Sequence, residues 1–536
     1  MSANTPVAGD APPAAPAAAR PAYVQSQPLQ GSARLWGTIA LSAATFMNVL
    51  DSSIANVSLP AIAGDLGVSP NQGTWVVTSF GVANAIAVPL TGWLSQRFGQ
   101  VRLFTLSVLL FVIASWLCGL APNMSTLIAM RALQGFVAGP MMPLAQTLLL
   151  SSYPPAMAGL AMAMWAMTTL VAPVMGPLLG GWITDNMHWG WIFYINIPVG
   201  FVAAFITWTL YKKRETQIQK LPIDSVGLTL LVLAVAAMQI MLDRGKELDW
   251  FHSSEIITLG LVAVIGGAFF IAWELTDDHP VVDLRLLKIR NFCVGSICLA
   301  IAYSLFIGNL VLLPLWLQQF MGYTSTQAGS LMAPVGLFAI LLSPVVGKNV
   351  QKTDPRMLAT FAFVMFAVVL MMRSHFNTQA DFTTIMIPTI VQGIAVAFFF
   401  VPLSTITLGG IPPAQMASAS GLSNFMRIVG GAFGTSITVT IWQDRAAMHH
   451  AQIIEAVNRG SQATADAMGG LAALGLNNTQ SLATINRLVD QQSFMLAAND
   501  IFMGSAAIFM LLIPSIWFAT RVRMTAPAAP GGDGAH

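Results

Sequence analysis

Long apolar runs separated by short polar segments fill most of the chain. About fourteen of these runs have the ~17–25 residues that a helix needs to cross a bilayer. They occupy residues 35–57, 74–94, 103–120, 127–150, 160–184, 191–211, 226–242, 256–275, 293–317, 328–346, 358–372, 385–408, 422–442 and 501–522. Lipid offers no hydrogen-bonding partner to an open backbone, so runs of this length are predicted to be helices. The pattern therefore predicts an all-α polytopic membrane protein.

The composition supports this fold class and narrows the function. Of the 536 residues, 55% are hydrophobic and 9% are charged, whereas soluble globular proteins carry about 25% charged residues. The net charge of +2 argues against a nucleic-acid partner. Cys118, Cys293 and Cys298 lie inside apolar runs, where small core residues are expected rather than disulfides or metal ligands. The sequence contains no phosphate-binding loop and no His-Glu-x-x-His pair, which argues against ATP, a metal or another cofactor.

The two ends of the chain and the basic residues predict its orientation. Residues 1–34 and 523–536 are rich in Ala, Pro and other small or polar residues, and they are expected to be disordered. Residues 1–34 also lack the pattern of a cleaved signal peptide, so the first run is expected to be an anchor. Most of the 24 Lys and Arg residues fall in loops on the N-terminal side of the membrane. The positive-inside rule then places both termini in the cytoplasm.

One carboxylate, Asp51, lies inside the first apolar run, with Asn56 five residues later. A charge at the bilayer centre costs roughly 2.5–3.5 kcal/mol even on lenient insertion scales, so it is rarely found there without a function. Arg131, in the fourth run, lies at a similar depth if each run is counted from its outer end at ~1.5 Å per residue. The hypothesis is that Asp51 takes up and releases protons while it pairs with and separates from Arg131. The alternative is a static buried ion pair that fixes the packing.

The fifth run contains closely spaced glycines and prolines at Pro173, Gly176, Pro177, Gly180 and Gly181. Glycines at positions i and i+4 let another backbone approach closely, and prolines remove backbone donors and bend a helix. The functional interpretation is a hinge or tight seam between two halves of the protein. The alternative is ordinary packing of small residues.

A short turn on the inner side joins the second and third runs, from Gly92 to Leu103. Gly92 and Gly99 are expected to allow close approach of the flanking helices. Arg97 and Arg102 are expected to cap helix C-termini.

Several polar residues at membrane depth are candidates to line a cavity, and each is equally able to bond a neighbouring helix. They are Asn84, Gln134, Gln146, Asn309 and Gln392. Arg427 lies near the inner end of the thirteenth run, where a side chain that reaches to lipid headgroups explains it. The alternative for Arg427 is a contact with substrate.

Together these stretches resemble the motifs of the major facilitator superfamily. The resemblance is to its fourteen-span drug–proton antiporters of the EmrB/QacA type. It rests on the Asp51 run, Gly92–Leu103, Arg131–Pro140, Pro173–Gly181, Leu242–Trp250 and Trp273–Pro280. The chain departs from the family at the inner turn, where Ser95 replaces an acidic residue and a basic pair is reduced to Arg102. That departure weakens the case for the usual charge relay at the inner gate.

The resemblance implies a major facilitator fold of two six-helix bundles plus two additional helices. The corresponding division is a cytoplasmic N-terminus 1–34, a first bundle 35–211, a linker 212–225, two added helices 226–275, a linker 276–292, a second bundle 293–522 and a tail 523–536. It also implies that Pro173–Gly181 is the exporter-type motif. The implied function is proton-driven multidrug efflux from the bacterial inner membrane. The implied partners are small-molecule drugs, a periplasmic adaptor (membrane-fusion) protein and a TolC-type outer-membrane channel.

Two alternatives to this function stay open at this point. One is a dedicated exporter of a single metabolite such as a siderophore, and the other is a membrane receptor or scaffold that transports nothing. Residues 443–500 form a large predicted periplasmic loop, in which Leu482, Ile485, Leu488 and Val489 have the spacing of an amphipathic helix. This helix either packs on its own loop or docks a partner outside the membrane.

Overall fold

A computed structural model describes residues 27–521, except 220–221, 223, 279, 351 and 458–460. The described chain is built from α-helices and a few short 3-10 turns, with no strand among these residues. The predicted disordered segments 1–34 and 523–536 lie largely or wholly outside the described residues. Residues 27–34 are the exception, and of these 31–34 already form the first turn of a helix.

Ten α-helices form the N-terminal half. They are α1 (Gly31–Asp65), α2 (Pro70–Gly73), α3 (Trp75–Ala87), α4 (Thr91–Phe98), α5 (Gln100–Gly119), α6 (Met124–Ala138), α7 (Met141–Ser152), α8 (Ala158–Asn186), α9 (Trp191–Tyr194) and α10 (Asn196–Tyr211). Helix-breaking residues explain why some predicted spans consist of two helices. The span 74–94 is divided at Pro89 into α3 and α4, which meet at a bend of 63°.

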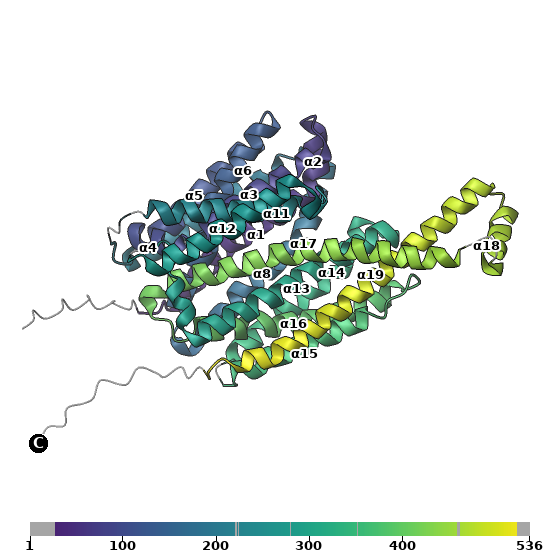
Figure 1. The fold of residues 1–536 in the computed structure, drawn as a ribbon. Helices are drawn as coiled ribbons and strands as arrows, with labels where there is room; N and C mark the ends of the chain where they lie inside the picture. The colour runs from purple at the N-terminus through teal and green to yellow at the C-terminus, as the bar shows by residue number, and fades with distance from the viewer. Residues whose placement is uncertain are drawn as a thin grey trace, which may run out of the picture.

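The remaining helices form an added pair and the C-terminal half (Figure 1). The pair is α11 (Ser225–Arg244) and α12 (Ser254–Thr276), and the half consists of α13 (Arg290–Phe320), α14 (Ser325–Asn349), α15 (Pro355–Arg373), α16 (Phe382–Leu408), α17 (Met416–Ala456), α18 (Gln462–Ala473) and α19 (Asn478–Trp517). The 3-10 turns are Pro155–Met157, Lys212–Arg214, Trp250–His252, Leu284–Lys288 and Pro413–Gln415.

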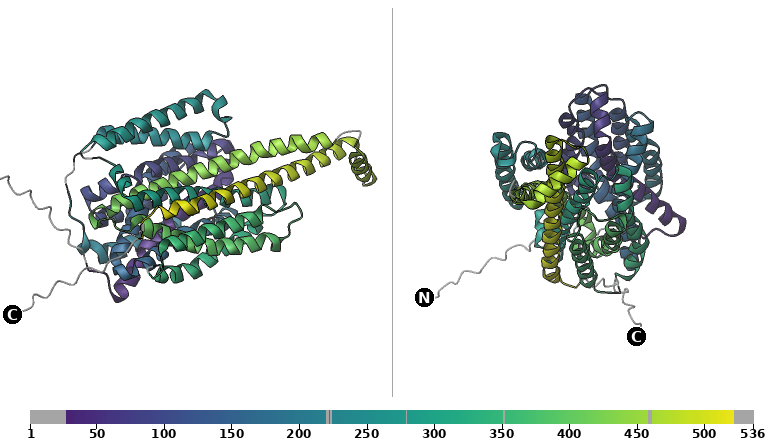
Figure 2. Two further views of the ribbon diagram at one scale, coloured as in Figure 1. Left: turned by 60° about the horizontal axis from the view of Figure 1, so that its bottom comes forward. Right: turned by 90° about the vertical axis from the view of Figure 1, so that its right-hand side faces the viewer.

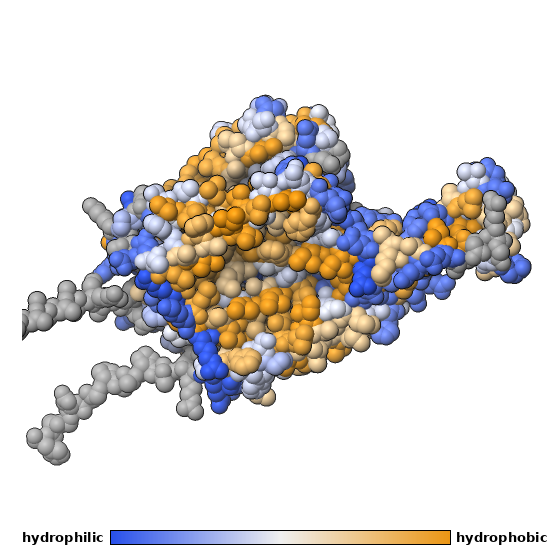
Figure 3. All heavy atoms as spheres, viewed as in Figure 1, coloured by the Kyte–Doolittle hydropathy of each residue, from blue (hydrophilic) through white to orange (hydrophobic). Residues whose placement is uncertain are grey.

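The described helices confirm the predicted membrane architecture. Thirteen are long and apolar enough to cross a membrane, and up to fourteen if the bent α3–α4 pair is one span. In Figure 3, apolar residues colour the middle of the molecule, whereas hydrophilic residues gather at the left edge and along the arm at the right. An apolar belt between two polar ends is what a bilayer requires of a helical bundle.

The helices α11 and α12 lie along the outside of the bundle, as the teal pair in Figure 2 shows. Helix α11 packs on α3 of the N-terminal half and on α17 of the C-terminal half. Ser436 Oγ donates to the Leu242 carbonyl at 2.8 Å, and Trp250 Nε1 donates to Thr440 Oγ1 at 3.0 Å. The pair is therefore attached to both halves.

The predicted loop 443–500 is mostly helical, which corrects the expected ends of the last two spans. Helix α17 continues to Ala456 and α19 already begins at Asn478, with α18 between them. The two long helices run side by side away from the bundle and form a projecting arm, here residues 443–500 (Figure 1). Trp442 Nε1 donates to the Phe494 carbonyl at 2.9 Å, and the Phe320 ring stacks on Phe494 at 4.2 Å. The apolar spacing around Leu482 and Leu488 belongs to α19, and both side chains are exposed.

Candidate functional site

The first predicted pair, Asp51 and Arg131, lies in contact inside the N-terminal half. Arg131 Nη1 of α6 donates to Asp51 Oδ2 of α1 at 2.5 Å, and both side chains are fully buried. Helices α1 and α6 bring the two residues to one depth, as the count along the sequence predicted. A buried ion pair of this kind is costly to break, because removing one partner leaves an uncompensated charge.

The guanidinium of Arg131 is held by more than the carboxylate. Its Nε donates to the Val76 carbonyl of α3 at 3.0 Å, and Nη1 also donates to Gln134 Oε1 at 2.6 Å. The rings of Phe80 and Phe193 lie 4.4 Å and 5.4 Å from Arg131 Cζ. Nη2 has no acceptor among the described residues. Arg131 is therefore fixed by three helices and shielded by aromatic rings.

The other oxygen of Asp51 accepts two amide hydrogen bonds. Gln134 Nε2 donates to Oδ1 at 3.0 Å, and Asn196 Nδ2 of α10 donates to it at 2.8 Å. Both amides also reach Ser115 Oγ of α5, at 2.7 Å from Gln134 and 3.3 Å from Asn196. Every one of these donors and acceptors is buried. The network thus links α1, α5, α6 and α10 through one carboxylate.

The glycines of α8 pack against α1, directly after Asp51 in the sequence. A Cβ added at Gly176 would lie 2.5 Å from Ser53 Cβ, and one at Gly180 would lie 3.0 Å from Ile54 Cγ1. A Cβ at Gly181 would meet nothing within 4 Å. Gly176 and Gly180 therefore pack within their own half and not across the two halves, although α8 itself also packs on α14 of the C-terminal half. Their position instead connects α8 to the helix that carries Asp51.

One hydrogen bond at this contact compensates for the backbone hydrogen bond that Pro177 removes. Pro177 has no amide hydrogen, so the Pro173 carbonyl, four residues earlier in α8, loses its usual partner within the helix. Ser53 Oγ of α1 donates to that carbonyl at 3.1 Å. A side chain two residues from Asp51 thus replaces a backbone bond of α8. The side chain of Pro177 lies outside the described residues.

Gly176→Ala is expected to lower the melting temperature, because the added methyl collides with Ser53. Gly181→Ala is the matched control, since its methyl enters open space and alanine favours helix by about 0.5–1 kcal/mol over glycine. Thermal unfolding of both purified variants in detergent checks the difference. Equal melting temperatures for the two variants would contradict the close α1–α8 contact.

The inner-turn residues form a contact between the halves and a helix cap. A Cβ at Gly92 of α4 would lie 2.8 Å from Ser418 Cα of α17, so the close approach expected there joins the two halves. Gly99 has φ +88, which favours glycine. Arg97 lies in the last turn of α4 with its guanidinium 5.4 Å from the Trp93 ring centroid. Arg102 does not cap a helix C-terminus: it is exposed in the first turn of α5.

Glu215, which sequence reasoning missed, provides the acidic group at this turn. Its Oε1 accepts from the Val101 amide at 3.0 Å and its Oε2 accepts from the Arg102 amide at 2.8 Å. A carboxylate at a helix N-terminus satisfies amides that have no partner within the helix and complements the helix dipole. Glu215 lies more than a hundred residues away in the sequence, so no local pattern indicates it.

Gln146 joins the two halves through a polar contact. Its Oε1 lies 2.5 Å from Ser420 Oγ and accepts from Asn424 Nδ2 of α17 at 3.0 Å. Nearby, α8 and α14 touch where a Cβ at Gly347 would lie 2.6 Å from the Gly159 carbonyl oxygen. These contacts and the Gly92 contact all lie toward the end of the bundle where α1 begins and α19 ends, here the terminal end. The halves are therefore closed against each other at the terminal end.

The other predicted polar residues have local or structural partners. Asn84 Nδ2 donates to the Gly135 carbonyl at 3.3 Å, and Asn309 Nδ2 donates to Ser505 Oγ at 3.1 Å. Asn56 is exposed and bonds the Ser52 carbonyl of its own helix, so it takes no part in the Asp51 network. Gln392 Oε1 accepts from Arg373 Nη2 at 2.7 Å. Arg373 is the last residue of α15 and is buried.

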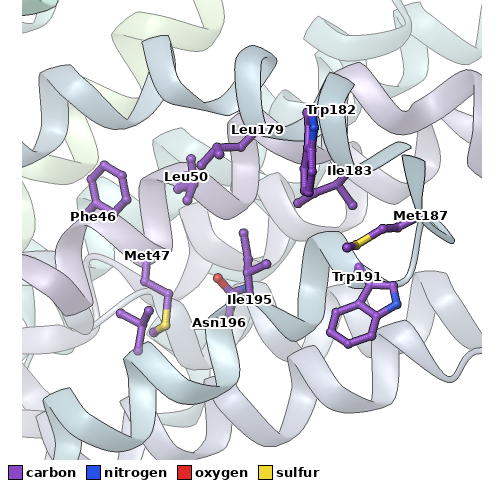
Figure 4. A pocket seen from close by; sticks show the side chains of 11 residues that line it. Phe46, Met47, Leu50, Leu179, Trp182, Ile183, Met187, Trp191, Ile195 and Asn196 are labelled. Carbon is purple, nitrogen blue, oxygen red and sulfur yellow. The ribbon is translucent and has the colours of Figure 1, made fainter. Parts of the chain in front are cut away.

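Figure 4 shows an apolar pocket of about 410 Å³, which shares Asn196 with the Asp51 network. Helices α1, α8, α9 and α10 line it, and Asn196 is the one lining side chain that bonds Asp51. The lining residues are Phe46, Met47, Leu50, Leu179, Trp182, Ile183, Met187, Trp191, Ile195, Asn196 and Val199. Its volume is in the range of pockets that hold drug-sized molecules.

Comparison with known proteins agrees with this architecture. The chain is 51% identical over 513 residues to "Multidrug export protein EmrB" of Escherichia coli (strain K12), a match that covers 96% of this chain and 100% of that protein. It is 49% identical over 509 residues to "Fatty acid resistance protein FarB" of Neisseria gonorrhoeae, covering 95% of this chain and 99% of that protein.

Two solved structures share the fold at low sequence identity. The human organic anion transporter MFSD10 (TETRAN) has a TM-score of 0.60 at 11% identity, over 90% of this chain and 99% of that one. The proton:xylose symporter XylE has a TM-score of 0.55 at 14% identity, over 90% and 96%. A family model described as the Major Facilitator Superfamily matches residues 41–435. The match confirms the resemblance that the motifs indicated: the chain belongs to the Major Facilitator Superfamily.

Proposed function

We propose that this protein is a proton-driven multidrug exporter of hydrophobic and amphipathic compounds in a bacterial inner membrane. The chain is 51% and 49% identical, over nearly its full length, to proteins named for multidrug export and fatty acid resistance. This similarity supports the transport direction and the substrate class. The single observation that carries the proton coupling is the fully buried carboxylate of Asp51, paired with Arg131 and bonded to two amides. An ionisable group at membrane depth is a candidate for a proton relay.

Protonation of Asp51 changes the balance of charge in the N-terminal half. The neutral acid no longer matches the positive charge of the buried Arg131 guanidinium. An uncompensated buried charge costs several kcal/mol, and rearrangement of α1 against α6 relieves that cost. Helix α8 follows α1, because Ser53 and the Gly176 contact hold the two helices together. Proton uptake thereby favours a different arrangement of this half.

In the proposed cycle, the two halves close against each other alternately at the two ends of the bundle, and protons and drug cross in opposite directions. In the proposed orientation both termini are cytoplasmic, so the closed terminal end is the cytoplasmic gate, formed by Gly92, Gln146 and Gly159 with their partners. Release of the Asp51 proton to the cytoplasm restores the Arg131 pair. Drug leaves on the opposite side.

Transport by the purified protein in proteoliposomes tests this function. A fluorescent amphipathic dye should move against its gradient when a pH gradient is imposed, and a protonophore should stop it. A panel of unrelated dyes separates broad specificity from a dedicated exporter of one metabolite. A folded wild type that moves no dye under the gradient would favour a receptor or scaffold instead.

The projecting arm 443–500 is the proposed docking site for a periplasmic adaptor, which in turn meets a TolC-type outer-membrane channel. The arm extends beyond the apolar belt and exposes Leu474, Leu482 and Leu488. Exposed apolar side chains on a water-facing element favour a protein partner.

Replacing the exposed Leu474, Leu482 and Leu488 by serine is expected to abolish co-purification with the adaptor. Dye transport in proteoliposomes should stay near the wild-type rate, because the Asp51 network lies in the other half. Affinity purification with tagged adaptor measures the first effect and the liposome assay the second. Undiminished co-purification would assign the adaptor to another surface.

A further inference from the structure

The geometry points to Arg427 as the binding site for the acidic group of an exported amphipath, such as a carboxylate attached to an apolar or aromatic body. This inference rests on the proposed export function and specifies the substrate chemistry. It starts from a cation that lies between the two halves and lacks a charge partner.

Arg427 lies on α17 but faces the N-terminal half rather than lipid headgroups. It is 3% exposed, which contradicts the expected snorkelling side chain. Its Nη2 lies 3.2 Å from Met142 Sδ of α7, and its Cζ lies 5.9 Å from the Trp165 ring centroid of α8. On the other side, Cζ lies 4.7 Å from the Tyr303 ring centroid of α13. Both halves therefore surround this guanidinium.

No acidic side chain of the described chain lies within ion-pairing distance of Arg427, in contrast to Arg131 with Asp51. Its charged group has one oxygen acceptor there, Asn424 Oδ1 at 3.0 Å from Nη2. The aromatic faces attract the cation, but this attraction is weaker than that of a negative charge and does not replace one. Burial of an unmatched charge is expensive, so the site favours an anion.

A second donor at the same contact also lacks an acceptor. Arg427 Nε and Trp165 Nε1 are both buried without a partner among the described residues. They belong to opposite halves, and both groups only donate hydrogen bonds. What is missing is therefore an acceptor-rich group, and a carboxylate accepts from an arginine in the strongest geometry available to side chains. Met142, Trp165 and Tyr303 offer apolar and aromatic surface to the apolar body of the bound amphipath.

The site is connected to the closed terminal end by one shared residue. Asn424 accepts from Arg427 and donates to Gln146 across the halves. A bound carboxylate that draws the guanidinium from Asn424 changes the side chain that holds this contact. Substrate binding and opening of the cytoplasmic gate are linked through Asn424.

The experiment compares two probes with the same body and different charge, 11-(dansylamino)undecanoic acid and its methyl ester. Fluorescence titration of the full-length protein in detergent gives the affinity for each. The wild type should bind the acid more tightly than the ester. Arg427→Gln should weaken acid binding by at least about tenfold and leave ester binding nearly unchanged, because a hydrogen bond to a charged group is lost. Arg427→Lys should recover part of the acid affinity.

Arg373→Gln serves as the matched control, because Arg373 is equally buried without a charge partner among the described residues but bonds Thr389 and Gln392 within one half. It should leave the ratio of acid to ester affinity unchanged. Equal wild-type affinity for both probes, or an equal loss of both in Arg427→Gln, would overturn the inference. Thermal unfolding in detergent first shows whether Arg427→Gln is folded. If it is not, Arg427→Lys takes its place, and an acid-to-ester affinity ratio unchanged from the wild type overturns the inference. Selective acid binding without transport of either probe would overturn the export function and leave the anion site intact.

Discussion

Asp51→Asn is expected to reduce gradient-driven dye efflux to background while the protein stays folded. Asparagine has the shape of aspartate, but it takes up no proton in the physiological range and carries no charge. Its amide nitrogen accepts no hydrogen bond, so it weakens the contact either with Arg131 or with Gln134 and Asn196, depending on which way the amide lies. The measurement is dye transport in proteoliposomes under an imposed pH gradient, beside thermal unfolding in detergent.

A control on the same helix separates loss of this carboxylate from a general loss of charge. Asp65, at the last turn of α1, accepts from Trp189 Nε1 at 2.7 Å and its side chain is 53% exposed. Asp65→Asn should transport dye at close to the wild-type rate. Full-rate efflux by Asp51→Asn would remove the proposed proton carrier from the mechanism, although the fold would stand.

Arg131→Met is expected to lower stability more than any surface change, because it leaves the carboxylate of Asp51 buried without its cation. Breaking a buried pair from one side costs about 3–5 kcal/mol. The double variant Asp51→Asn with Arg131→Met should regain much of this stability, since neither charge remains, yet it should not transport. Thermal unfolding of the two single variants and the double variant gives the coupling between the residues.

The outcome that contradicts this pairing is additivity. If the losses from the single variants simply sum in the double variant, the two charges do not stabilise each other in the folded protein. If the double variant regains efflux, the pair is a packing element and the proton is carried elsewhere.

The sequence predicts the membrane spans and the Asp51–Arg131 pair for the same physical reason. Lipid penalises both an unsatisfied backbone and an unpaired charge, so apolar runs and isolated charges are visible without a structure. The penalty for a serine or an amide is smaller and its partner is not unique. Ser115 and Asn196 therefore carried no signal of their own, although they complete the network around Asp51.

The sequence did not predict the contacts of residues whose role depends on the direction that their helix faces. Spacing indicates that Gly176 packs closely, but only the structure shows that its neighbour is α1 rather than the other half. Depth along α17 suggested a headgroup contact for Arg427, while the rotation of the helix turns it inward. Glu215 meets α5 only because the chain returns there after α10. Helix facing and distant returns of the chain are set by packing, not by local pattern.

Because α17 is one continuous helix, it connects the terminal end of the bundle rigidly to the arm. Its 41 residues, about 61 Å at 1.5 Å per residue, run without a break from Ser418 and Asn424 at the terminal end to the middle of the arm. A tilt of about 10° around the terminal end would sweep the far end of this rod through roughly 10 Å. If the proposed cycle tilts α17, the arm moves with it, and a partner bound to the arm outside the membrane would be displaced as well.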